Sequence, residues 1–232
     1  MKTFRTRRGP FSERPHFKDG EIERMCLEEL RANDLLPADP GPVRIDRFIE
    51  RRFKVAPRYD ALPDGVLGFT KFGPRGVEEM VISEQLDSDS SASARRRLRS
   101  TLAHEAGHCL LHTYLFSLGS KPAALFGAGD GKPEILCRDV QGEQVRSGYD
   151  GKWWEYQANR AIGGLLLPMP LVQHACDPYL QQAGSLGVRR LPPDQQEKIA
   201  RSLSQLFDVN PIVVRIRLGE LFPADEGGQL LL

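Results

Sequence analysis

The chain has 232 residues, of which 40% are hydrophobic and 27% charged, and a net charge of +1. This length allows one domain with a substantial core, and the near-neutral charge argues against a generally acidic or basic partner. No run approaches the roughly 20 apolar residues of a membrane span, the N-terminus has no apolar segment typical of a secretory signal, and the four scattered cysteines form no CxxC pair. We therefore expect a reduced, cytoplasmic protein.

The N-terminal stretch is basic, with six Lys or Arg against two Asp or Glu in residues 1–20. Because Gly and Pro are interspersed, we predict a flexible tail over residues 1–18, with a phosphate-binding arm as the alternative. The spacing of apolar residues then predicts helices over 19–36 and 43–53. Short stretches rich in β-branched or aromatic residues predict a small antiparallel sheet, with strands at 53–55, 65–72 and 78–83.

The second half of the chain has a mainly helical pattern. It begins with a long predicted helix over 92–116, and residues 117–152, which are rich in Gly and charge, are predicted to be an insertion or flap. Further helices are predicted at 153–167, 171–183, 193–207 and 211–221. These elements indicate an α+β fold in which the sheet packs on helices. We expect a main domain over 19–183 and a C-terminal helical region over 184–232.

The long helix contains the sequence TLAHEAGHCLLH at residues 101–112, with three of the chain's five histidines. Positions four apart on an α-helix differ by about 40° in direction and about 6 Å in height, so His104 and His108 can converge on one ion. Glu105 points about 100° away from His104, where it can reach water on that ion but is poorly placed to bind it. The motif predicts a zinc site with Glu105 as general base. The alternative is a chance HExxH on an ordinary helix.

Small or apolar residues recur along the same helix, at Leu98, Leu102, Ala106 and Cys109. We expect this stripe to pack into the core and the neighbouring histidine edge to face a cleft. His112 lies eight residues after His104, about 12 Å along the helix, which is too far for both to share one ion comfortably. We therefore interpret His112 as a partner of nearby polar groups, with ligation as the alternative.

A third ligand has to come from another segment, and WWEYQANRAIGGLLLP offers Glu155 at the start of a predicted helix. Ala158 permits close packing against the motif helix, and Asn159 is placed to orient a metal-bound imidazole through its other nitrogen. The alternative role for Glu155 is that of a carboxylate stabilised by the helix dipole. Weaker ligand candidates lie in the predicted insertion, at Asp130, Glu134, Cys137, Asp139 and Glu143. A Cys137 thiolate that holds the enzyme latent at the open zinc position is a further alternative to an inert cysteine.

The sequence HEAGHCLLH, followed by E-x-x-A-N and then LLLP, resembles the pattern of the ImmA/IrrE family of metallopeptidases over roughly residues 43–171. The combination is far more specific than HExxH alone. The resemblance implies a zincin-like fold with His104, His108 and Glu155 as zinc ligands and Glu105 as catalytic base. Members of this family often cut a helix-turn-helix repressor, which switches on stress or mobile-element genes. The chain departs from the family in the AIGG that follows the AN pair and in the long gap before Glu155.

The predicted reaction is metal-assisted hydrolysis of a peptide bond. Glu105 takes the proton of the attacking water and later delivers it to the leaving amine. An oxyanion donor is also expected, and four candidates remain open, namely Tyr149, Tyr156, Arg160 and His174.

The two C-terminal helices, joined by DVN, resemble a helix-turn-helix in which Asn210 caps the second helix and Arg215 and Arg217 could meet phosphates. We interpret them first as packing against the catalytic core. The alternative is a surface for a repressor or for weak nucleic-acid contact, there or on the basic tail. The basic run RRRLR at 95–99 is interpreted as a solvated helix start. Two other function classes stay open: a DNA-binding regulator, and a non-catalytic partner-binding protein, with a structural or degenerate metal site.

Overall fold

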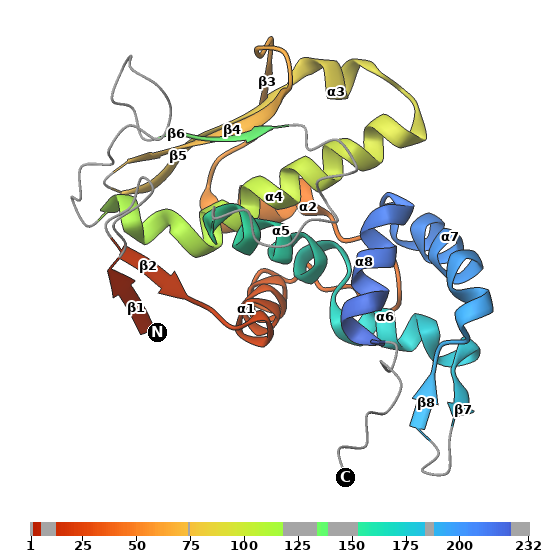
Figure 1. The fold of residues 1–232 in the computed structure, drawn as a ribbon. Helices are drawn as coiled ribbons and strands as arrows, with labels where there is room; N and C mark the ends of the chain where they lie inside the picture. Colours follow the sequence, from red (N-terminus) through yellow and green to blue (C-terminus); the bar gives the residue numbers. More distant parts are fainter. Residues whose placement is uncertain are drawn as a thin grey trace.

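The computed structural model of the protein describes residues 2–5, 13–73, 75–117, 134–138, 153–183 and 188–223. The fold is α+β, as predicted, with a small β-sheet that covers one side of the long helix α4 (Ala92–Ser117) (Figure 1). Helix α5 (Trp153–Leu166) packs along α4, and α1 (Asp19–Ala32) packs against α5. The other helices are α2 (Ile45–Phe53), α3 (Glu84–Ser88), α6 (Met169–Cys176), α7 (Gln196–Phe207) and α8 (Pro211–Leu221), with 3₁₀ turns at Asp177–Tyr179 and Pro193–Gln195.

The sheet has four strands in the order β3-β5-β4-β6 and is mixed, whereas the sequence indicated an antiparallel sheet. The strands are β3 (Arg58–Asp60), β4 (Val66–Gly73), β5 (Gly76–Ser83) and β6 (Glu134–Arg138). Strand β4 pairs antiparallel with β5 and with β6, and β3 pairs parallel with β5. The chain reverses direction between β3 and β4 and again at Gly76, whose φ is +119°, so β5 runs in the same direction as β3.

The strand predicted at 53–55 is absent, because α2 extends to Phe53 and ends at Lys54 in the left-handed conformation, with φ 62°. The predicted helix over 19–36 ends early for a related reason. Asp34 has φ 57°, and the N–H of Leu35 donates to the carbonyl of Leu30 at 2.9 Å, which closes the end of α1. The predicted helices over 92–116 and 211–221 are confirmed within one residue at each end.

Two short hairpins were not expected from the sequence. In the N-terminal stretch predicted to be a tail, β1 (Lys2–Arg5) pairs antiparallel with β2 (Glu13–His16). In the stretch predicted as a helix over 171–183, α6 ends at Cys176 and β7 (Gln181–Ala183) pairs with β8 (Val188–Arg190). Most of the predicted insertion over 117–152 lies outside the described residues, although β6 forms an edge of the sheet.

Helix α4 is buried on all sides along the motif, which exceeds the single buried stripe that its sequence predicted. Every residue from Thr101 to Cys109 is buried. The sheet packs on one side, where a Cβ atom on Gly68 of β4 would lie 3.3 Å from the Thr101 methyl group, and α5 and α2 cover other sides. The helix begins next to Ser91, whose hydroxyl accepts a hydrogen bond from the N–H of Ala94 at 3.1 Å.

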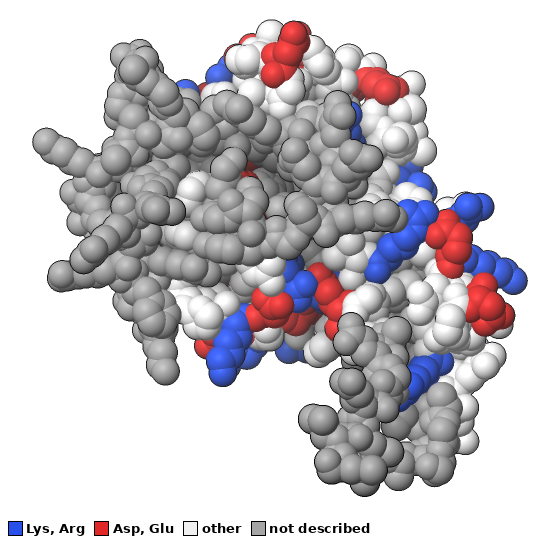
Figure 2. Space-filling model, in the orientation of Figure 1, with Lys and Arg blue, Asp and Glu red and all other residues white. Residues whose placement is uncertain are grey.

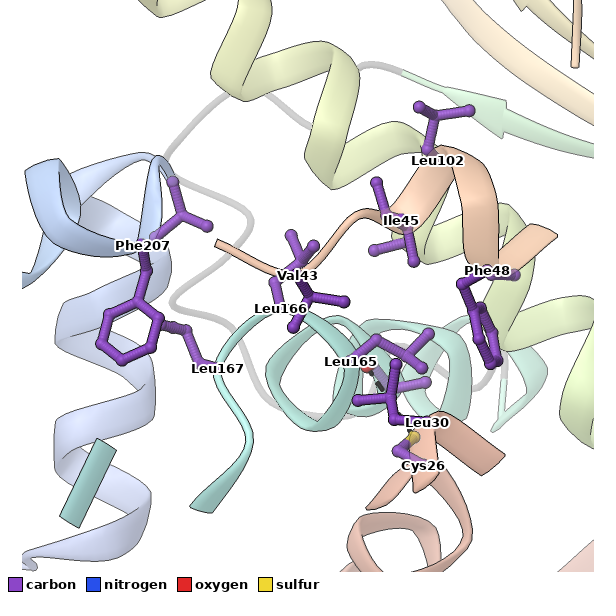
Figure 3. Close-up of a cluster of buried hydrophobic side chains, with 14 of the residues drawn as sticks. Cys26, Leu30, Val43, Ile45, Phe48, Leu102, Leu165, Leu166, Leu167 and Phe207 are labelled. Atoms are coloured by element: carbon purple, nitrogen blue, oxygen red, sulfur yellow. Dashed lines mark hydrogen bonds between the residues drawn. The ribbon is translucent and has the colours of Figure 1, made fainter. Parts of the chain in front are cut away.

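The hydrophobic core joins the N-terminal helices, α4, α5 and the C-terminal helices (Figure 3). The side chains that meet there include Leu30, Val43, Phe48, Leu102, Leu165 and Phe207, each at most 3% exposed. The thiol of Cys26 on α1 also donates a weak hydrogen bond to the carbonyl of Ala161 on α5, at 3.9 Å. The core therefore holds α5 in place on the side away from the sheet.

Three arginines of the RRRLR run hold the turn between α7 and α8 against α4. Asp208 in that turn accepts hydrogen bonds from Arg95 at 2.9 Å and from Arg96 at 3.2 Å, and its carbonyl accepts one from Arg99 at 2.9 Å. The run thus binds a neighbouring segment instead of being only a solvated helix start. Among the residues that the structure describes, no helix combines the length and apolar character needed to cross a membrane.

Candidate metal centre

Two histidines of α4 and one glutamate of α5 converge on a single point. The Nε2 atom of His104 lies 3.0 Å from Nε2 of His108 and 3.1 Å from Oε2 of Glu155, and His108 Nε2 lies 3.6 Å from that same Glu155 oxygen. One ligand atom from each residue thus lies within 4.8 Å of the other two, so the three residues can hold a metal ion.

The convergent group is buried at the histidines and meets solvent at the glutamate. His108 is fully buried and His104 is 6% exposed, whereas the Glu155 side chain is 22% exposed. The sequence predicted that the histidine edge of α4 would face a cleft. In the structure the histidine edge is buried, and the most exposed side chain of the group is that of Glu155 on α5.

A glycine allows α4 and α5 to approach closely enough for these residues to meet. A Cβ atom on Gly107 would lie 2.9 Å from the Ala161 methyl group and 3.0 Å from the carbonyl oxygen of Ala158. Ala158 is fully buried at this contact, as expected from its position one turn after Glu155. Small residues on both helices therefore set the distance between the histidines and their partner carboxylate.

Replacing Gly107 by Ala is expected to destabilise the protein by about 1 to 3 kcal/mol, because the added methyl group overpacks the contact between α4 and α5. Affinity for a divalent metal ion is expected to fall with it, since Glu155 moves away from the histidines. The matched control is Gly219→Ala on α8, where a Cβ atom meets nothing within 4 Å and helix propensity favours Ala by up to about 1 kcal/mol. Urea unfolding and zinc titration measure both effects, and equal stability of the two variants would contradict the close contact.

The second nitrogen of each convergent histidine contacts a polar side chain. His104 Nδ1 lies 3.0 Å from Oδ1 of Asn159, the residue predicted to orient an imidazole. His108 Nδ1 lies 3.0 Å from Nδ1 of His112. His112 thus contacts a polar neighbour, as we interpreted from its position on the helix, and it is not part of the convergent group.

The hydrogen bond to Asn159 bears on whether the group fits a metal. An amide oxygen can only accept a hydrogen bond, so Nδ1 of a neutral His104 ring carries the hydrogen. The Nε2 atom of that ring then carries no hydrogen and has a free lone pair. This lone pair faces the Nε2 atom of His108 and the Glu155 carboxylate, and such electron-rich atoms repel one another unless a cation or a proton lies among them. Two imidazoles and one carboxylate are also a donor set of catalytic zinc sites. The residues present therefore fit a divalent metal ion.

The pKa shifts at the centre follow the same electrostatics. Burial lowers the pKa of His104, but the hydrogen bond and charge of Glu155 outweigh this effect, and the pKa is raised overall. Burial lowers the pKa of His108. Burial raises the pKa of Glu155, yet the charge of His108 and the hydrogen bond that His104 donates when its ring is protonated hold that pKa well below its usual range. The centre thus favours positive charge beside the Glu155 carboxylate.

Glu105 is a fully buried carboxylate next to the convergent group. Its Oε2 atom accepts a hydrogen bond of 2.6 Å from the hydroxyl of Thr70, on strand β4, while its Oε1 atom is buried without a hydrogen-bond partner. Burial raises the pKa of Glu105 to about 7, although the charge of His104 opposes this shift. A buried polar atom without a partner is costly, so Oε1 is expected to have its partner outside the protein chain.

The comparisons with known proteins assign no family to these residues. No protein-family model matches the chain, and no curated protein matches it. The centre is therefore interpreted from its own geometry and from the motif resemblance described above.

The predicted oxyanion donors lie elsewhere or are not described. Tyr156 is exposed, and its hydroxyl lies 3.2 Å from Asp19 of α1. Arg160 forms ion pairs with Asp19 and with Glu220 of α8. His174 is exposed on α6, and Tyr149 lies outside the described residues, as do Asp130, Asp139, Glu143 and the side chains of Glu134 and Cys137. None of the donors that the structure describes can be assigned to the centre.

Two buried residues at the centre were missed by the sequence reasoning. Thr70 lies on the inward face of β4, where the buried positions alternate along the strand. A single polar residue among the inward positions 66, 68, 70 and 72 was the available signal. Gln157 on α5 is 4% exposed and contacts His112. It lies between Glu155 and Asn159 in the sequence, but that position gave no comparable signal.

Proposed function

We propose that this chain is a zinc-dependent endopeptidase of the kind that the ImmA/IrrE resemblance implies. The observation that carries the proposal is the buried Glu105 carboxylate, with one oxygen bound by Thr70 and the other without a partner in the protein chain. A metal-holding group alone also suits a structural site. A buried carboxylate beside that group, with one oxygen hydrogen-bonded and the other without a partner in the protein chain, suits a residue that acts on water and substrate.

His104, His108 and Glu155 would hold the ion, and zinc bound there supplies a Lewis acid that polarises the peptide carbonyl and lowers the pKa of water. Thr70 occupies Oε2 of Glu105, which leaves Oε1 to accept the proton of the attacking water. The same oxygen then delivers the proton to the leaving amide nitrogen, and the carboxylate is regenerated.

We further propose that the substrate is a specific protein of the helix-turn-helix repressor class, and that its cleavage relieves repression. The support for this substrate is the sequence resemblance. Three cysteines are buried free thiols, namely Cys26, Cys109 and Cys176, which is consistent with action in the reducing cytoplasm.

Zinc analysis and a cleavage assay test the proposal together. The purified protein is expected to hold about one zinc per chain. The Glu155→Ala variant is expected to lose it, while the control Glu28→Ala, at an exposed position on α1, keeps it. Helix-turn-helix proteins encoded beside the gene, and a mixed peptide library, are then incubated with the zinc-loaded protein and analysed by mass spectrometry. A wild-type protein that binds no zinc overturns the proposal, and zinc binding with no cleavage of either substrate favours the partner-binding alternative.

Thr70→Val is expected to lower kcat about 10- to 100-fold, which corresponds to the loss of a hydrogen bond to a charged group. Valine keeps the shape of threonine but cannot donate to Glu105 Oε2, so the carboxylate is no longer held in one orientation. KM and zinc content are expected to stay unchanged, because Thr70 is fully buried and is not among the three residues that can hold the ion. Thr70→Ser keeps the donor and is the matched control. Equal kcat values for the valine and serine variants would show that Thr70 has no role in orienting Glu105.

A further inference from the structure

A chain of buried hydrogen bonds connects the candidate metal centre with the N-terminal strand β2. Its first two contacts run from His108 Nδ1 to His112 Nδ1 and from His112 Nε2 to Gln157 Oε1, each 3.0 Å long. The last runs from Gln157 Nε2 to the carbonyl oxygen of Pro15, also at 3.0 Å. His108 and His112 are fully buried and Gln157 is 4% exposed, so bulk solvent does not compete for these bonds.

Which atom donates and which accepts in each of these hydrogen bonds follows from the last one, at Pro15. A carbonyl oxygen can only accept, so Gln157 presents its NH₂ group to Pro15 and its amide oxygen to His112. The amide oxygen is likewise only an acceptor, so His112 Nε2 carries a hydrogen and its Nδ1, in a neutral ring, accepts. His108 Nδ1 therefore carries the hydrogen of its ring, and His108 Nε2 faces Glu155 and His104 as a lone pair.

The two convergent histidines are held differently. Asn159, the partner of His104, is exposed, whereas His112 and Gln157 are buried and each contacts a partner at both ends. The His112 ring also packs edge-on against Trp153 at the start of α5, with 5.5 Å between ring centroids. His108 is thus the ligand whose ring is fixed most completely by the protein.

We propose that His112 and Gln157 are positioning residues, which hold His108 in the tautomer whose Nε2 can bind a metal ion. The backbone of β2, through Pro15, sets the direction of every hydrogen bond in this chain. The proposal rests on the proposed function and deepens it, since it assigns the tuning of zinc affinity to residues that do not touch the ion. Partners behind the ligands of a metal typically change affinity about 10- to 100-fold when they are lost.

Two shape-conserving variants test the proposal by zinc affinity. His112→Phe keeps a ring against Trp153, and Gln157→Met keeps the length of the side chain, but neither replacement can form these hydrogen bonds. The zinc dissociation constant, measured in competition with a chromophoric chelator, is expected to rise about 10- to 100-fold in each. The matched controls His174→Phe and Gln205→Met, at exposed positions on α6 and α7, are expected to leave it unchanged.

The double variant separates positioning from simple structural support. Because Gln157 acts through His112, the His112→Phe/Gln157→Met protein is expected to bind zinc no more weakly than His112→Phe alone. If the two losses of zinc affinity multiply in the double variant, Gln157 does not act through His112, and the proposal is overturned. A role in folding alone would lower the melting temperature and leave the zinc affinity of the folded protein unchanged, which would overturn it as well.

Nitrogen-15 NMR of the histidine rings provides a measurement on the wild-type protein, independent of whether the variants fold. His108 is expected to carry its hydrogen on Nδ1 in both the zinc-free and the zinc-loaded states. A hydrogen on Nε2 in the zinc-free protein overturns the proposal. A wild-type protein that binds no zinc would remove the proposed function itself, whereas wild-type zinc affinity in both single variants would remove only this inference.

Discussion

Replacing Glu105 by Gln is expected to lower the rate of peptide hydrolysis by about 10²- to 10⁴-fold, the range that a general acid–base group contributes. Glutamine matches glutamate in size, and its amide oxygen can still accept the hydrogen bond of Thr70, so the side chain stays in place. The amide nitrogen then occupies the position of the free Oε1 atom, where it cannot accept a proton. The measurement is kcat/KM, together with zinc content and melting temperature.

Zinc content is expected to stay near the wild-type value in Glu105→Gln, because Glu105 is not among the convergent ligand atoms. Glu78→Gln, the same change at an exposed position on β5, is expected to keep full activity. The variant also separates the alternative functions. A partner-binding protein would bind its partner equally well with and without Glu105 and would give no cut product in either case. A DNA-binding regulator would show salt-sensitive DNA binding that is the same in the variant and the wild type. Cleavage at the wild-type rate would contradict the role of general base.

The part of the centre that lies within one helix follows from the sequence, because the period of an α-helix fixes the relative directions of its side chains. His104 and His108 share an edge of α4 for this reason. Glu155 and Asn159 were identified from a second helical pattern, and the structure brings both to the histidines. What the period cannot supply is the distance between two helices. Here that distance depends on Gly107, which the sequence reasoning passed over.

Contacts that cross between distant segments could not be derived from spacing. Thr70 reaches Glu105 from a strand 35 residues earlier, and Pro15 reaches Gln157 across 142 residues. The AIGG sequence departs from the ImmA/IrrE pattern that the motif resembles, and the physical reason for its two glycines also appears only in three dimensions. A Cβ atom on Gly164 would lie 2.8 Å from the Cβ of Cys26, and one on Gly163 would lie 3.4 Å from the Arg217 side chain. These glycines give α1 and α8 room to pack against α5.

That packing decides how the C-terminal helices are used. Arg217, which the sequence offered as a phosphate contact, is 4% exposed and points into the protein. Its guanidinium donates to Glu23 of α1 at 2.5 Å and to the carbonyl of Leu167 at 3.0 Å. Arg215 is exposed but pairs with Glu197 at 2.7 Å, and on this face of the molecule positive and negative side chains are intermixed over α7 and α8 (Figure 2). The observed contacts thus favour packing against the core over binding of nucleic acid.

The Asn210 cap predicted for α8 is made by the backbone alone. Its carbonyl accepts from the N–H groups of Val213 and Val214, and its side chain forms no capping hydrogen bond. Local capping by this side chain therefore does not hold α8 in place. The contacts that hold α8 include its apolar contacts with the core and the buried ion pair of Arg217 with Glu23.

Replacing Arg217 by Met is therefore expected to destabilise the protein by about 3 to 5 kcal/mol, because it leaves the largely buried Glu23 carboxylate without its cation. Arg201→Met on α7, the same change at a side chain that is 72% exposed, is expected to shift stability by less than about 0.5 kcal/mol. Urea unfolding measures both, and a single transition is expected because α8 is joined to α1 and α5 through buried groups. A loss of less than about 1 kcal/mol in Arg217→Met would show that the ion pair of Arg217 with Glu23 contributes little to holding α8. A separate transition for α7 and α8 would favour an independent C-terminal module, and with it the nucleic-acid alternative.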